Sequence, residues 1–90
     1  MIAGSFLFKL KDTHGLPLDM ALDRVIELGH EIYWPSFFAQ ARKQGWWDYQ
    51  IDDAIRYGLQ DAFIPQAEKD RVRGLFVKWW VDNGPCPQSM

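Results

Sequence analysis

The acidic side chains between residues 48 and 61 are the first candidates for chemistry. Asp52 and Asp53 are adjacent, with Asp48 and Asp61 on either side of them. Paired carboxylates act as acid and base in hydrolytic sites when both reach the same substrate bond. On a helix, neighbouring side chains diverge by about 100°, so Asp52 and Asp53 would not converge. We therefore interpret this segment as a solvated acidic face, which could attract a basic protein partner.

The two histidines and the single cysteine give little support to a metal site or a nucleophile. His14 and His30 each adjoin a glycine that could end a helix, where a cation suits the negative end of the helix dipole. No further residue stands at metal-ligand spacing from them. Cys86 lies between two prolines, without the electropositive setting that activates a thiol. The sequence therefore predicts no metal, no cofactor and no enzyme.

Aromatic residues make up 16% of the chain, more than a small core can easily enclose. Trp, Tyr and Arg are the residue types enriched at the energetic centres of protein interfaces. A helical wheel turns Tyr57 outward, whereas Trp47 could instead pack over the start of the following helix as a hydrophobic staple. The predicted partner-binding surface consists of Trp46, Trp47, Tyr49, Asp53, Arg56, Tyr57 and Gln60.

Basic residues near the C-terminus offer an alternative site. Arg71, Arg73 and Lys78 lie on the last predicted helix, which could read nucleic acid in the manner of a helix-turn-helix protein. Arg71 and Lys78 fall on one side of this helix and Arg73 on another, so they form no single stripe. The net charge is −2, whereas proteins that bind phosphate backbones usually have a large basic excess. A solvated surface is the favoured interpretation.

Prolines and glycines divide the chain into the helices that would position these residues. Proline is common at the start of a helix and glycine just after its end. Between these positions the apolar side chains recur at helical spacing. The predicted helices cover residues 17–28, 35–44, 49–62 with Asp48 as N-cap, and 65–83 with Gly84 as the stop.

The segment 5–14 admits two interpretations. A helix capped by Ser5 would turn Phe6 and Leu7 inward, whereas a strand would place Phe6 and Phe8 on one face. We favour the helix, because a lone strand would leave its backbone without a partner. The residues predicted to face the core are Phe6, Leu7, Leu10, Leu18, Ala21, Leu22, Val25, Ile26, Trp34, Phe37, Phe38, Ala41, Ile51, Ala54, Ile55, Leu59, Ala62, Val72, Leu75, Phe76, Trp79 and Trp80.

Length and composition set the class of protein. Ninety residues, 48% of them hydrophobic and 24% charged, suit one globular domain. We predict an all-α, compact single-domain bundle of four to five short helices over residues 1–84, with a flexible tail at 85–90. One cysteine allows no internal disulfide, and no run approaches the ~20 apolar residues of a membrane span. These features favour a cytoplasmic protein.

The middle half of the chain resembles small uncharacterised proteins encoded by bacteriophages and prophages. The stretch that carries the resemblance runs from Trp34-Pro35-Ser36-Phe37-Phe38 through Ala41-Arg42 to Gly45-Trp46-Trp47-Asp48-Tyr49. Phage accessory proteins of this size include inhibitors of host machinery, among them anti-CRISPR proteins, which occupy a surface of a larger complex. The resemblance implies binding without catalysis and transfers no functional residue.

The leading hypothesis is therefore a small non-catalytic module that binds another protein and, by the resemblance, inhibits a host protein complex. The alternative is a helix-turn-helix-like nucleic-acid-binding regulator that uses the last helix. A homodimer is a further hypothesis, since exposed aromatic side chains can pair with their own copy across a two-fold axis.

Overall fold

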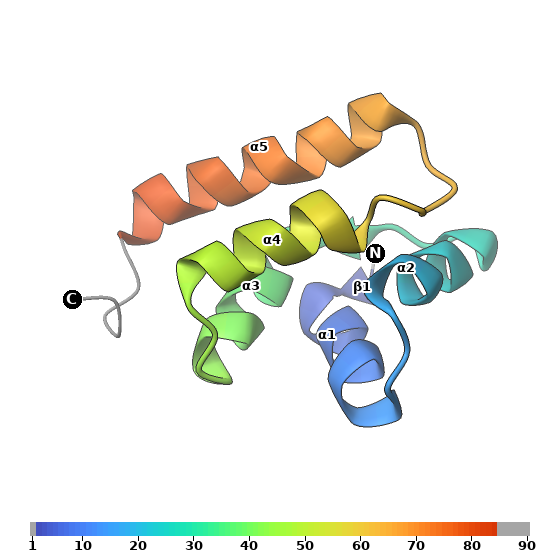
Figure 1. Ribbon diagram of the computed structural model, residues 1–90, viewed down its shortest axis with the longest axis horizontal. Coiled ribbons are helices and arrows are strands. Elements are labelled where there is room, and N and C mark those ends of the chain that lie inside the picture. Colours follow the sequence, from blue (N-terminus) through green and yellow to red (C-terminus); the bar gives the residue numbers. More distant parts are fainter. Residues whose placement is uncertain (1, 85–90) are drawn as a thin grey trace.

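A computed structural model describes residues 2–84 of the chain. Those residues form five helices and one pair of very short strands (Figure 1). The predicted all-α class is confirmed, and the predicted tail at 85–90 lies outside the described residues. The elements are β1 (Ile2–Ala3), α1 (Gly4–His14), α2 (Leu18–Glu27), β2 (Ile32–Tyr33), α3 (Trp34–Lys43), α4 (Asp48–Gly58) and α5 (Gln66–Asn83).

The helix boundaries follow the proline and glycine positions closely. Pro17 and Pro65 immediately precede α2 and α5, and Pro35 occupies the first turn of α3. The glycines predicted to stop helices all have a positive φ, between 69° and 88°; they are Gly15, Gly29, Gly45 and Gly84. The predicted end of the fourth helix is wrong, because α4 ends at Gly58, although Leu59 and Ala62 beyond it are buried as predicted.

The two strands join the N-terminus to the middle of the chain. They run parallel, with Ile2 opposite Ile32 and Ala3 opposite Tyr33. The Ile2 N–H donates to the Glu31 carbonyl at 2.7 Å. Residues 30–33 fall between two predicted helices, and their pairing with the N-terminus was not predicted. The pairing brings the start of α1 directly against the start of α3.

The helix predicted over residues 5–14 is confirmed, but its orientation was wrong. Leu7 is fully buried as predicted, whereas Phe6 is 48% exposed and Phe8 takes its place in the core. Ser5 does not cap the helix, because the helix begins one residue earlier and has no side-chain cap. Instead, the Ser5 backbone N–H donates to Ser36 Oγ at 3.3 Å, which ties α1 to α3.

The reason for this orientation is the close approach of α1 and α3 at Gly4. A Cβ atom placed on Gly4 would lie 2.5 Å from the Phe37 nitrogen and 2.6 Å from the Tyr33 carbonyl oxygen. Only glycine fits where two backbones come this close. The contact fixes which side of α1 faces α3, and that side carries Leu7 and Phe8.

The core is largely aromatic and centres on α3. Phe37 and Phe38 are fully buried, and Phe37 meets Phe8 edge-on with ring centroids 5.6 Å apart. Phe38 similarly contacts Phe76 of α5 at 5.1 Å. Edge-to-face pairs of this kind add stability beyond the burial of their area. The core prediction for Ile26 was wrong, since α2 leaves it 40% exposed.

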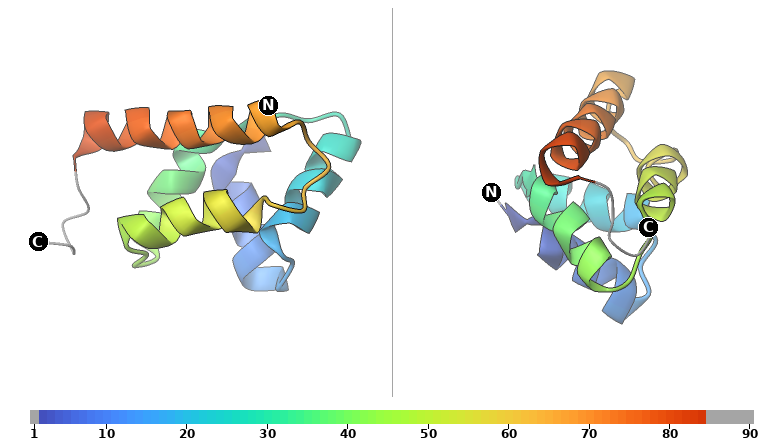
Figure 2. Two further views of the ribbon diagram at one scale, coloured as in Figure 1. Left: turned by 45° about the horizontal axis from the view of Figure 1, so that its top comes forward. Right: turned by 90° about the vertical axis from the view of Figure 1, so that its left-hand side faces the viewer.

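Helices α4 and α5 run in opposite directions, joined by the loop of residues 59–65. Figures 1 and 2 show them side by side, with α5 the longest element of the described chain. Helix α3 contacts both of them as well as α1, and α2 contacts α1 and α4. The outer sides of α4 and α5 are therefore the parts of the fold least covered by other helices.

Candidate protein-binding surface

The outer side of α4 is exposed as the sequence predicted. Tyr49 is 65% and Tyr57 61% exposed, and the polar residues Asp53, Arg56 and Gln60 are exposed with them. Arg56 reaches Asp52 of its own helix, with Nη2 3.2 Å from Oδ2. This side of α4 thus presents two phenol rings among polar side chains, a composition typical of interface residues.

The two neighbouring tryptophans have different environments. Trp46 is partly buried and packs edge-on against Phe8 at 5.2 Å, with Lys11 Nζ 4.8 Å from its ring centre. Trp47 is 39% exposed, and its backbone N–H donates to Gln50 Oε1 at 2.7 Å. The prediction that Trp46 is exposed for partner binding was therefore wrong in part, because its ring packs against the core beside α1.

Asp48 links three helices. It was predicted as the N-cap of the fourth helix, but Trp47 occupies that position and Asp48 is the first helical residue. Its carboxylate lies 3.0 Å from Arg42 Nε of α3 and accepts a 2.8 Å bond from the indole N–H of Trp80 on α5. The Arg42 guanidinium in turn covers the ring of Trp79 at 4.5 Å. These charge-assisted contacts fix the spacing of α4 and α5 at this end.

A groove of about 290 Å³ lies between α4 and α5 at the same end. Trp80, predicted to face the core, is 39% exposed and borders this groove. Val77 beside it is 55% exposed, and Val81, one turn after Val77, is 67% exposed. The residues that line the groove are Asp48, Tyr49, Asp52, Phe76, Val77 and Trp80. We call Tyr49, Val77, Trp80 and Val81 the groove patch.

The groove patch could have been suspected from one signal in the sequence. The C-terminal half of α5 reads Leu75-Phe76-Val77-Lys78-Trp79-Trp80-Val81, which is apolar almost all round. A helix of this kind is normally covered on most sides. Here only part of the circumference meets the core, so Val77, Trp80 and Val81 remain in contact with solvent.

The adjacent aspartates have different surroundings. Asp52 lies 3.5 Å from Arg73 Nε of α5 in addition to its contact with Arg56. Asp53 is exposed. The Asp52 ion pairs connect α4 to α5, so this carboxylate has a structural role in the spacing of the two helices. No cluster of three or more metal-ligating side chains occurs within residues 2–84.

Two of the four basic residues of α5, Arg71 and Arg73, pair with acids. Arg71 Nε lies 3.1 Å from both carboxylate oxygens of Glu68, and Arg73 contacts Asp52. Hydrogen bonds from Arg71 lower the pKa of Glu68, and these bonds together with the nearby Glu31 charge raise the pKa of Arg71. Lys78 is exposed. Arg71 and Arg73 thus offer reduced positive charge to a phosphate backbone, which weighs against the nucleic-acid alternative.

No protein-family model, curated protein sequence or solved structure matches this chain. In the part of the chain that the structure describes, no helix combines the length and the apolar character needed to cross a bilayer.

Proposed function

We propose that this chain is a small, non-catalytic protein-binding module that holds an amphipathic helix of another protein in the α4–α5 groove. The observation that supports this function is the groove patch, in which Tyr49, Val77 and Trp80 from two helices are exposed along one groove and Val81 is exposed one turn beyond Val77. Contiguous exposed apolar surface of this kind marks interaction sites in folded proteins.

The occupant follows from the shape and chemistry of the groove. Two antiparallel helices offer a third helix a channel between them, which apolar residues at helical spacing can fill. The Asp48 contacts with Arg42 and Trp80 hold the two walls apart at a fixed distance before a partner arrives. A preformed groove loses little conformational freedom on binding, which favours affinity. A polar rim continues this surface with Arg56 and Tyr57 of α4 and Gln60 just after it.

The biological role concerns the identity of the partner and the effect of binding it. The resemblance of residues 34–49 to phage-encoded accessory proteins supports a host protein complex as the partner and inhibition as the result. Inhibition would follow if the captured helix is one that the host complex needs for its own assembly. The exposed aromatic rings of α4 would then supply the central contacts.

The test begins by identifying the partner through the groove itself. A photo-crosslinking amino acid at Val77 or Val81 should capture the partner, whereas the same amino acid at Met20 of α2 should not; Met20 is similarly exposed, at 58%. The purified partner is then titrated against wild type, Val77→Lys and Met20→Lys by calorimetry. We expect Val77→Lys to lose at least about tenfold in affinity, about 1.4 kcal/mol, and Met20→Lys to bind as wild type.

Equal affinity of wild type and Val77→Lys would contradict the proposal. Light scattering at several concentrations separates the homodimer hypothesis from binding of a different protein. A dimer that Val77→Lys dissociates, with no captured partner, would assign the groove to a second copy of the chain and overturn the proposed heterologous function.

A further inference from the structure

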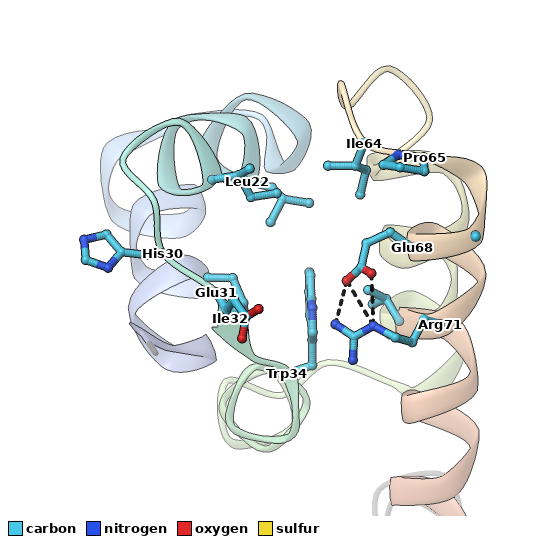
Figure 3. A pocket seen from close by; sticks show the side chains of 12 residues that line it. Leu22, His30, Glu31, Ile32, Trp34, Ile64, Pro65, Glu68 and Arg71 are labelled. Carbon is cyan, nitrogen blue, oxygen red and sulfur yellow. Dashed lines mark hydrogen bonds and ion pairs between the residues drawn. The ribbon is translucent and has the colours of Figure 1, made fainter.

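A second, larger cavity lies between α2, the β2 connection and the first half of α5 (Figure 3). Its volume is about 650 Å³, within the usual range of small-molecule sites. It shares no lining residue with the α4–α5 groove. The residues that line it are Leu22, Ile26, His30, Glu31, Ile32, Trp34, Ile64, Pro65, Ala67, Glu68, Arg71 and Val72.

The most informative group in this cavity is the Trp34 side chain. Only 3% of the residue is exposed, and its ring packs on Phe37 at 5.4 Å and on Phe38 at 6.2 Å between ring centroids. Within residues 2–84, nothing accepts a hydrogen bond from its indole N–H. No fully buried side-chain nitrogen there lacks a partner, so this N–H must lie at the small exposed part of the ring. A rigid ring with an unused donor is suited to bind an acceptor on a ligand.

The charges around the cavity favour a cation. Two nitrogens of Arg71, Nε and Nη2, donate hydrogen bonds to the Glu68 carboxylate. The opposite charges of this pair therefore largely cancel. Glu31 lies across the cavity from them in Figure 3, and no cationic group of the described residues lies within ion-pair distance of it. The His30 ring points away from the cavity in the same view. Glu31 and Glu68 both act on the single charge of Arg71, so one negative charge remains in excess among these three side chains.

The remaining walls are apolar. Leu22 and Ile26 come from α2, whereas Ile64 and Val72 come from the segment that leads into and forms α5. Leu22 and Val72 are almost completely buried, so they form a fixed floor. Ile26 is 40% exposed and Ile64 is half-buried, so a ligand body that covers these two side chains would release water from apolar surface.

We propose that this cavity binds a small amphipathic amine whose apolar body also carries a hydrogen-bond acceptor. The apolar body lies against Ile26 and Ile64, the acceptor takes the Trp34 indole N–H, and the ammonium group pairs with Glu31. The free amino end of a peptide with an apolar first residue has this chemistry, and so does a free amino-acid amide. The site is separate from the groove and does not depend on the proposed function.

Three probes that share a phenylalanine body but differ in charge test the proposal. They are phenylalanine amide with a free ammonium, N-acetylphenylalanine amide without charge, and N-acetylphenylalanine with a carboxylate. The readout is the indole N–H signal of Trp34 in a nitrogen-15 spectrum, assigned by its loss in Trp34→Phe. We expect saturable movement of this signal with the cation and at least about tenfold weaker binding of the neutral probe, with the anion weakest.

A matched pair of variants tests the role of the carboxylate. Glu31→Gln should weaken phenylalanine amide about tenfold, whereas Glu27→Gln, which removes an exposed carboxylate of α2, should leave binding unchanged. Well-dispersed nitrogen-15 spectra of both variants would show that each variant is folded. To separate the two sources, the tripeptide Phe-Gly-Gly is compared with phenylalanine amide; equal or tighter binding of the tripeptide assigns the site to peptide amino ends, and weaker binding to free amines.

The proposal is overturned by any of three results. The neutral or anionic probe could bind as tightly as the cation, the Trp34 signal could stay fixed in the presence of all probes, or Glu31→Gln could bind phenylalanine amide as wild type does. Each result removes one of the contacts that define the site.

Discussion

The indole N–H of Trp80 donates a 2.8 Å hydrogen bond to Asp48 Oδ2, so the last turns of α5 are attached to the first residue of α4. The same carboxylate also holds Arg42 of α3 at 3.0 Å. One side chain, 19% exposed, therefore sets the geometry of the proposed binding groove.

Replacing Asp48 with alanine should destabilise the protein by about 2–3 kcal/mol. The change removes a charge-assisted hydrogen bond and an ion pair that is mostly shielded from water, and it leaves Arg42 without this partner. Urea unfolding monitored by circular dichroism measures the loss. Asp53→Ala on the exposed side of α4 is the matched control and should stay within about 0.5 kcal/mol of wild type. Equal effects of the two substitutions would show that the Asp48 contacts contribute nothing specific.

Two glycine substitutions should have opposite effects. Gly4→Ala would place a methyl group 2.5 Å from the Phe37 nitrogen, and backbone atoms cannot yield cheaply. We expect a loss of about 2–3 kcal/mol or more, from overpacking between α1 and α3. Gly74→Ala lies inside α5 with no neighbouring atom within 4 Å, so it should stabilise the helix by about 0.5–1 kcal/mol. Thermal unfolding of both variants checks the prediction, and a stable Gly4→Ala protein would refute the close contact.

The two adjacent tryptophans should differ in their effect on stability. Trp46→Ala removes a ring that packs on Phe8 and lies beneath Lys11, and we expect a cost of about 2–3 kcal/mol. Trp47→Ala removes a more exposed ring and should cost less than about 1 kcal/mol. Denaturant unfolding midpoints of the two variants measure these losses of stability. A larger loss in Trp47→Ala than in Trp46→Ala would contradict the environments described for the two rings.

The Glu68–Arg71 pair predicts a small acid-dependent effect. Hydrogen bonds from Arg71 hold the pKa of Glu68 below its ordinary value of 4.5 in the folded protein. A depressed folded pKa gives stability that is complete above the unfolded value and is lost as the pH falls through the folded pKa. Both side chains are substantially exposed, so the contribution should stay below about 0.5 kcal/mol. Carbon-13 titration of Glu68 should show its pKa rising in Arg71→Gln and staying unchanged in Arg73→Gln.

Local pattern was sufficient for much of the fold. Trp34, Phe37, Phe38 and Ala41 recur at helical spacing before Gly45, and all four are buried in α3. Their positions depend mainly on short-range periodicity, which a single sequence displays directly. The exposure of Tyr57 was predictable for the same reason, because it lies opposite the buried stripe of α4.

Contacts between distant segments account for the errors. Phe8 is in the core and Phe6 is outside because Gly4 meets residues 33 and 37, and nothing near α1 in the sequence indicates this partner. Trp46 packs on Phe8, nearly forty residues earlier in the chain. In α5, apolar residues occupy almost the whole circumference, so periodicity could not tell whether Trp80 or Leu75 faces inward.

The pairing of β1 with β2 has a consequence for how the chain acquires its structure during synthesis. Residues 2 and 3 meet their partners only after residue 33 has left the ribosome, and the α3 surface that covers Leu7 and Phe8 emerges later still. A nascent chain that ends before α3 therefore lacks the surface on which its first helix packs, and Phe8 would be exposed to water. The first helix must therefore wait for α3, so β1, α1, β2 and α3 should acquire their structure together.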